Sequence, residues 1–293
     1  MWQQLMVTVD EDLAEEVSDA LMDAGALSVS FLDAGDQALF EPPLGTTPVW
    51  AQTRVVGLFE EGGDLAATRS ALGRRFGEVR LRDWSEEALA DQAWERAWLE
   101  HFRPMHFGSR LWVCPTGFTV EETDSVVMLL DPGLAFGTGT HPTTALCLEW
   151  LDAADLHGAT VVDYGCGSGI LGIAAALLGA SSVHAVDIDP QALVATVDNA
   201  RKNAVEDKIE TSLPDRLSSF ESDIVLANIL ANPLMELAAE LRSRVRPGGR
   251  IVLSGILAEQ ADAVASVYAG KGFEMEPAVF GEGWARLAGV RRA

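Results

Sequence analysis

The stretch that decides the fold reads Val161-Val162-Asp163-Tyr164-Gly165-Cys166-Gly167-Ser168-Gly169. Two valines lead to an acid, three glycines follow at alternate positions, and an apolar helical pattern begins at Ile170. A buried strand, a tight turn and a helix in this order form the ligand-binding turn of α/β sheets, because glycine lets the backbone turn sharply and a ligand approach closely. We therefore predict a ligand site at Gly165 and Gly167.

Strands and helices alternate around this motif, which predicts a parallel sheet covered by helices. The expected strands are 111–114, 126–131, 160–163, 182–187, 223–227 and 250–254, with a final strand pair at 273–279 and 284–290. The expected helices are 142–151, 170–178, 190–203, 233–245 and 259–269. We assign residues 105–293 to one α/β domain with a Rossmann-like sheet.

The first 84 residues follow a different pattern. Strands are expected at 3–9, 27–31, 50–59 and 78–83, with helices at 13–21 and 64–76. This βαββαβ order predicts an α+β domain of the ferredoxin-like type. Residues 85–104 are expected to form a connector helix, in which Trp94 and Trp98 lie one turn apart and pack between the two domains.

The charge and the composition exclude several classes of protein. The net charge is −23, and residues 1–60 hold eleven acids and one base, Arg54. Such a surface repels nucleic acid and attracts basic proteins, so we expect no direct nucleic-acid binding. No long apolar run and no basic leader is present, which predicts a cytoplasmic protein away from the membrane. Cys114, Cys147 and Cys166 are too far apart for a zinc motif, so no metal and no disulfide framework is expected.

Two acids indicate the ligand. The segment Gly167 to Gly172 also matches the G-x-G-x-x-G dinucleotide fingerprint, but Asp163 just before the turn would repel a pyrophosphate. S-adenosylmethionine has no phosphate and carries a cationic sulfonium and ammonium. Asp187, at the end of the next strand, is placed to accept hydrogen bonds from the ribose hydroxyls. We predict S-adenosylmethionine as the cofactor, with a nicotinamide dinucleotide as the alternative.

A third strand end supplies the predicted catalytic residue, Asn228. The carboxyl ends of parallel strands meet at one edge, so Asn228 is expected beside Gly165 and Asp187. Its amide oxygen suits a hydrogen bond from a target amine, whose lone pair would then face the methyl group. The apolar residues 229–231 would lower the pKa of that amine by disfavouring the ammonium form.

The loop from Phe136 to Thr144 is rich in glycine and hydroxyl groups. We predict that it folds over the methionine half of the cofactor, with Thr144 as a polar contact. His141 has two open interpretations: a catalytic role, or a start for the helix that follows at Pro142.

Three segments together resemble the bacterial methyltransferases of large-subunit ribosomal protein eleven. They are Leu130-Asp131-Pro132-Gly133-Leu134-Ala135-Phe136-Gly137-Thr138-Gly139-Thr140-His141-Pro142-Thr143-Thr144, the glycine motif from Asp163 to Gly169, and Asn228-Ile229-Leu230-Ala231. The resemblance covers essentially the whole chain and implies a class I methyltransferase fold. It implies methylation of lysine ε-amines and the N-terminal α-amine, with up to three methyl groups added, and recognition of the ribosomal protein by the N-terminal domain before assembly.

The resemblance also implies cofactor contacts. The positions that match are Thr144, Gly165, Asp187 and Asn228, and we add their neighbours in the motifs, Thr143, Asp163, Gly167 and Phe136, to the predicted site. Compared with the wider amino-methyltransferase motif Asn-Pro-Pro-Tyr, residues 229–231 lack the aromatic platform that stacks on a planar base. That difference favours an aliphatic amine over adenine. The alternatives left open are an RNA or other amino-group methyltransferase, a nicotinamide-dependent oxidoreductase and a non-enzymatic binding protein.

Overall fold

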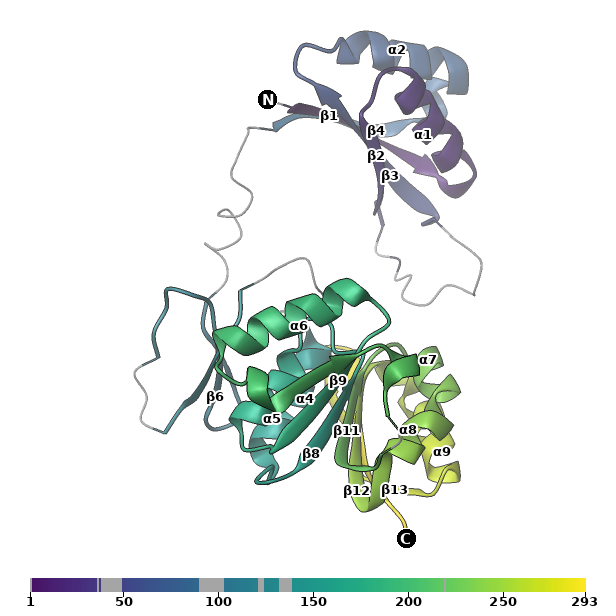
Figure 1. The fold of residues 1–293 in the computed structure, drawn as a ribbon. Helices are drawn as coiled ribbons and strands as arrows, with labels where there is room; N and C mark the ends of the chain where they lie inside the picture. Colours follow the sequence, from purple (N-terminus) through teal and green to yellow (C-terminus); the bar gives the residue numbers. More distant parts are fainter. Residues whose placement is uncertain are drawn as a thin grey trace. The chain divides into compact units, whose positions relative to one another are not determined.

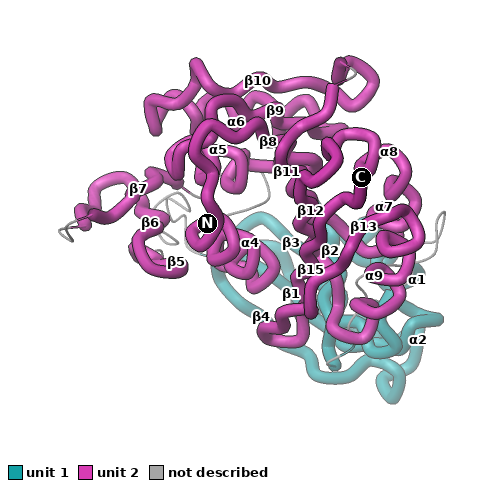
Figure 2. Tube along the Cα trace, turned by 90° about the horizontal axis from the view of Figure 1, so that it is seen from below, with its two compact units in different colours: residues 1–100 teal, residues 101–293 magenta. Residues whose placement is uncertain are grey.

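The computed structural model describes residues 2–35, 37, 49–89, 103–120, 124–131, 139–218 and 220–293. The chain divides into two compact units, residues 1–100 and 101–293, which Figure 2 colours separately. None of the helices in these ranges is long and apolar enough to cross a membrane. Cys114, Cys147 and Cys166 are free and buried.

The first unit contains one four-stranded antiparallel sheet with the strand order β2-β3-β1-β4. Val17 and Leu21 of helix α1 belong to the same hydrophobic core as Leu5 and Val7 of the sheet. The order of elements confirms the predicted ferredoxin-like arrangement. The elements are β1 (Trp2–Asp10), α1 (Ala14–Asp23), β2 (Ser28–Asp33), β3 (Gln52–Glu60), α2 (Leu65–Phe76) and β4 (Arg82–Leu89).

The predicted start of the connector helix is wrong. Residues 85–89 belong to β4, where Leu89 pairs with Trp2 and Glu86 pairs with Leu5 of β1. Tertiary pairing of this kind outweighs the helix propensity of a segment rich in glutamate and alanine. The remainder of the predicted connector from residue 90 to residue 102, with Trp94 and Trp98, lies outside the described residues.

The second unit is built on a sheet with the strand order β10-β9-β8-β11-β12-β15-β13, and β14 pairs with β15. The run from β10 to β12 is parallel, and β15 is antiparallel to its neighbours. This sheet (Figure 1) confirms the predicted Rossmann-like fold, whose strand order reverses beside β8. The strands are β8 (Thr160–Tyr164), β9 (Ser182–Val186), β10 (Ile209–Ser212), β11 (Ser222–Asn228), β12 (Val245–Leu257), β13 (Phe273–Met275), β14 (Val279–Gly281) and β15 (Trp284–Arg291).

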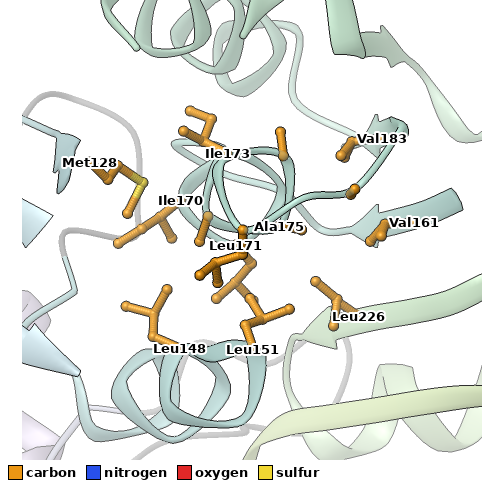
Figure 3. Close-up of a cluster of buried hydrophobic side chains, with 14 of the residues drawn as sticks. Met128, Leu148, Leu151, Val161, Ile170, Leu171, Ile173, Ala175, Val183 and Leu226 are labelled. Carbon is orange, nitrogen blue, oxygen red and sulfur yellow. The ribbon is translucent and has the colours of Figure 1, made fainter. Parts of the chain in front are cut away.

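Helices cover both faces of this sheet. Val161 and Leu226 face the core shared with α4, α5 and α6 (Figure 3), whereas Val162 and Val225 face α7, α8 and α9. The valine-rich strands are therefore buried on both sides, as parallel strands usually are. The predicted helix at 233–245 is two helices, α7 and α8. The bounds are α4 (Pro142–Ala153), α5 (Ile170–Leu177), α6 (Pro190–Lys202), α7 (Ala231–Glu236), α8 (Ala238–Arg244) and α9 (Ala261–Gly270).

A small three-stranded sheet packs on the first of these cores through Phe107, Val113 and Met128. Its strands are β5 (Met105–Phe107), β6 (Leu111–Cys114) and β7 (Val126–Leu129). Asn203, just after α6, accepts a hydrogen bond from the Leu129 amide and donates to the Leu129 carbonyl. This contact fixes the end of β7 against α6, close to the start of the predicted cofactor loop.

Candidate cofactor and methyl-transfer site

Three adjacent strands carry the main predicted site residues at the same level. Tyr164 of β8 lies opposite Val186 of β9 and Ala227 of β11. The residues one position further along, Gly165, Asp187 and Asn228, therefore lie next to each other at the carboxyl edge of the sheet. This is the edge at which open α/β sheets bind ligands.

Asp187 holds the glycine turn and keeps capacity for a ligand. Its Oδ2 accepts a hydrogen bond from the Gly167 amide at 2.9 Å, and its Oδ1 accepts one from the Asp189 amide at 3.0 Å. The side chain is half-buried. An ionised carboxylate has about four acceptor positions, so two remain for hydroxyl groups. The two remaining acceptor positions match the two adjacent hydroxyl groups of a ribose.

The protein's own packing requires glycine at two positions of the turn. Gly165 and Gly169 have φ angles of 78° and 80°, in the left-handed region that favours glycine. A Cβ atom on Gly165 would lie 2.4 Å from Cγ2 of Ile229, and one on Gly169 would lie 2.7 Å from Cγ2 of Thr196. The sequence predicted close approach of a ligand here, but the space beside these two glycines is filled by side chains from α6 and from the end of β11.

Asp163 contacts helix α5. Only 1% of its surface is exposed, and its Oδ2 accepts a hydrogen bond from the Gly172 amide at 2.8 Å. Burial is the main cause that raises the pKa of Asp163 to about 7; the Gly172 hydrogen bond opposes this shift and the nearby Asp187 charge adds to it. The carboxyl group is therefore partly protonated near neutral pH, which weakens the predicted charge selection against a pyrophosphate. A direct cofactor contact by Asp163 stays a prediction.

The buried Asp163 makes the free energy of unfolding depend on pH. Because the pKa is raised in the folded state, the folded protein binds more protons than the unfolded chain between about pH 4 and pH 7. The stability of the wild type therefore falls as pH rises through this window. Relative to the wild type, Asp163→Asn should gain about 1 to 3 kcal/mol between pH 5 and pH 7 in urea unfolding. Parallel pH profiles for the two proteins would contradict the assignment.

A side-chain hydrogen bond joins the end of β11 to α4. Asn228 donates a hydrogen bond from Nδ2 to Oγ1 of Thr144 at 3.2 Å, and Thr144 is fully buried. The neighbouring Thr143 instead pairs its Oγ1 with Nδ1 of His141 at 2.8 Å. Thr144 is therefore the threonine that the fold brings to Asn228. Phe136 lies outside the described residues.

His141 starts helix α4, in agreement with the second of its two interpretations. It occupies the N-cap, where Nδ1 accepts a hydrogen bond from the Thr143 amide at 3.3 Å. Its ring meets the ring of Trp284 edge-on, with the ring centroids 4.8 Å apart. Burial lowers the pKa of His141, although the charge of Glu282 opposes this effect. The imidazole is consequently held in its neutral form near pH 7.

Sequence reasoning missed two residues at this edge, Trp284 and Gly255. Ser254 of β12 pairs with Asn228, so Gly255 lies level with Ile229. A Cβ atom on Gly255 would lie 2.3 Å from the Ile229 carbonyl oxygen. A glycine inside a strand pattern often indicates that another backbone approaches closely. Gly255 in the segment Leu253-Ser254-Gly255-Ile256 fits this pattern and could have been found from it.

The mostly parallel sheet, the glycine turn after β8, the acid after β9 and the asparagine at the end of β11 define a class I methyltransferase. Comparison with known proteins identifies the family. The family profile described as ribosomal protein L11 methyltransferase (PrmA) matches residues 1–292. The chain belongs to this family.

Individual relatives agree with the family assignment. The chain is 87% identical over 292 residues to the ribosomal protein L11 methyltransferase of Methylococcus capsulatus, covering 100% of both chains. It is 51% identical to that of Pseudomonas fluorescens, covering 99% of both. The crystal structure of a ribosomal protein L11 methylase from Lactobacillus delbrueckii subsp. bulgaricus superposes with a TM-score of 0.59 at 32% identity, covering 66% of this chain and 100% of that one. The protein is thus a methyltransferase, which rules out the oxidoreductase and non-enzymatic alternatives.

Proposed function

We propose that the protein transfers methyl groups from S-adenosylmethionine to lysine ε-amines and the N-terminal α-amine of ribosomal protein L11. The observation that supports this proposal is that Gly165, Asp187 and Asn228 lie side by side at the ends of three adjacent strands. The chain that carries them belongs to the ribosomal protein L11 methyltransferase family. The modification would take place in the cytoplasm, before the ribosomal protein joins its RNA.

The residues at the sheet edge fit the cofactor. The free acceptor positions of Asp187 would bind the ribose hydroxyls, and the turn from Gly165 to Gly167 would lie against the nucleoside. Thr143, Thr144 and Phe136 are the proposed contacts of the methionine half. When bound, S-adenosylmethionine supplies a methyl group that its positive sulfonium makes electrophilic.

Asn228 would position the attacking amine. Because its Nδ2 is bonded to Thr144, its Oδ1 has a fixed direction and can accept an N–H of a neutral amine. Alignment of this kind can contribute about 7–11 kcal/mol in a displacement reaction. The partly exposed Ile229 and the exposed Leu230 present apolar surface beside this position, which favours the neutral amine by disfavouring its ammonium form.

Residues 1–89, which include all of β4, are the proposed recognition domain. The exposed side of α1 and the turn before it carry acidic side chains, while the same helix buries Val17 and Leu21. An acidic surface attracts a basic ribosomal protein and repels RNA. The exposed acids are Glu11, Asp12, Glu15, Glu16, Asp19 and Asp23.

The experiment is incubation of the purified protein with labelled S-adenosylmethionine and either free ribosomal protein L11 or protein-free ribosomal RNA. We expect label in the protein alone, and mass spectrometry should place it on lysine side chains and the N-terminal amine. Label in the RNA, or none in ribosomal protein L11, would contradict the proposal. Asn228→Ala serves as the inactive control.

A further inference from the structure

Ile229 follows the proposed catalytic residue directly and is enclosed on two sides by glycines. On one side, its Cγ2 methyl group occupies the position that a Cβ atom of Gly165 would need, at 2.4 Å. On the other side, a Cβ atom of Gly255 would lie 2.3 Å from the carbonyl oxygen of Ile229, 2.7 Å from its carbonyl carbon and 3.1 Å from its amide nitrogen. The absence of a side chain at Gly165 thus leaves room for the side chain of Ile229, and the absence of one at Gly255 leaves room for its main chain.

Both glycines have backbone angles that other residues rarely adopt. The φ angle is 78° at Gly165 and 82° at Gly255. Gly165 directly follows β8, and Gly255 lies within β12. These two strands are the neighbours of β11 on either side. The end of β11 is therefore held between its two neighbours just where Asn228 makes its bond to Thr144. Because Asn228 and Ile229 share a peptide bond, a shift of the Ile229 backbone changes the backbone position from which the Asn228 side chain extends.

We propose that Ile229 is a positioning residue for methyl transfer, and that its β-branch against Gly165, together with its main chain against Gly255, fixes the direction of the Asn228 amide. This role rests on the proposed function, because it matters only if Asn228 orients the amine. This positioning role does not require Ile229 or Gly255 to touch the substrate. The branch at Cβ is the critical feature, since the Cγ2 atom fills the space above Gly165.

Two substitutions separate the shape of the side chain from its size. Ile229→Val removes the terminal methyl group but keeps Cγ2, whereas Ile229→Leu keeps the number of carbon atoms but moves the branch away from Cβ. If Ile229 only filled apolar space, the smaller valine would be the more harmful change. If its β-branch positions Asn228, leucine is the more harmful change.

The kinetic test measures kcat and KM with ribosomal protein L11 and the Kd of S-adenosylmethionine. We expect Ile229→Val to keep kcat within about twofold of the wild type and Ile229→Leu to lower it at least about tenfold, with the Kd unchanged. Val264→Ala, which removes two methyl groups from the same hydrophobic core, is the control for general loss of stability. It should lower the melting temperature without lowering kcat. Equal kcat values for the two Ile229 variants would overturn the proposal.

A second readout does not depend on the reaction. The side-chain amide of Asn228, assigned by comparison with Asn228→Asp, should show slow hydrogen exchange in nuclear magnetic resonance spectra because it is bonded to Thr144. We expect this protection to persist in Ile229→Val and to be lost in Ile229→Leu. If the wild type transfers no methyl groups but this pattern holds, the proposed function fails, while the effect of the Ile229 β-branch on the Asn228 amide stands. If methyl transfer is normal and protection is equal in both variants, the positioning role fails and the function stands.

Discussion

Asn228→Ala is expected to lower kcat for methyl transfer about 100- to 1000-fold, the loss usually seen when one preorganised polar group is removed from an active site. Alanine removes the only side chain on β11 that meets Thr144 among the described hydrogen bonds, and with it the proposed acceptor for the amine. The amine would then lose its orientation toward the methyl group. The measurement is a steady-state assay with ribosomal protein L11, together with a melting curve to confirm that the variant folds.

Thr144→Val provides a graded comparison for Asn228. Valine has nearly the shape of threonine but cannot accept the hydrogen bond from Nδ2, so the Asn228 amide becomes free to rotate. We expect a loss of about tenfold in kcat, smaller than that of Asn228→Ala. A rate for Asn228→Ala within about threefold of the wild type would remove Asn228 from the mechanism.

Asp187→Ala should weaken the binding of S-adenosylmethionine at least about 100-fold, because hydrogen bonds to a charged group contribute about 1.5–3 kcal/mol each. Two such bonds to the ribose are proposed, and alanine would also leave the Gly167 amide without its acceptor. The glycine turn would therefore lose its anchor as well as its ligand contact. Calorimetric titration of the wild type and the variant gives the two Kd values.

Asp189→Ala is the matched control for Asp187. Asp189 lies two residues further on, is exposed, and caps α6 by accepting a hydrogen bond from the Gln191 amide at 2.9 Å. Its loss should cost about 1 kcal/mol of stability and leave the Kd within about twofold of the wild type. If both aspartate variants weakened the binding of S-adenosylmethionine equally, the effect would come from the general loss of charge. The predicted contact between Asp187 and the ribose would then be wrong.

The fold was largely predictable because its signals are local. The alternating glycines after Val162 mark the turn, and each buried strand carries apolar residues such as Val161 and Val225 for both faces. The elements that the sequence did not predict depend on distant partners. The extension of β4 to Leu89 needs β1 beside it, and the short strand β10 lies at the edge of the described sheet, where it pairs with β9.

The site was predictable in its positions but not in its contacts. Because the carboxyl ends of parallel strands meet at one edge, the sequence alone predicts that Gly165, Asp187 and Asn228 lie together. Thr143 and Thr144 point about 100° apart on a helix, so only the placement of α4 beside β11 decides that Thr144 meets Asn228. Likewise, the contact of Asp163 with Gly172 and the packing of Ile229 on Gly255 are long-range features that motif spacing does not encode.

The most direct measurement is a crystal structure of the protein with S-adenosylmethionine or its demethylated product. We predict the ribose within hydrogen-bonding distance of the Asp187 carboxylate, the nucleoside against the Gly165–Gly167 turn, and the sulfur on the side that faces Asn228. A cofactor bound at another edge of the sheet, or in contact with Asp187 but with its sulfur turned away from Asn228, would contradict this account.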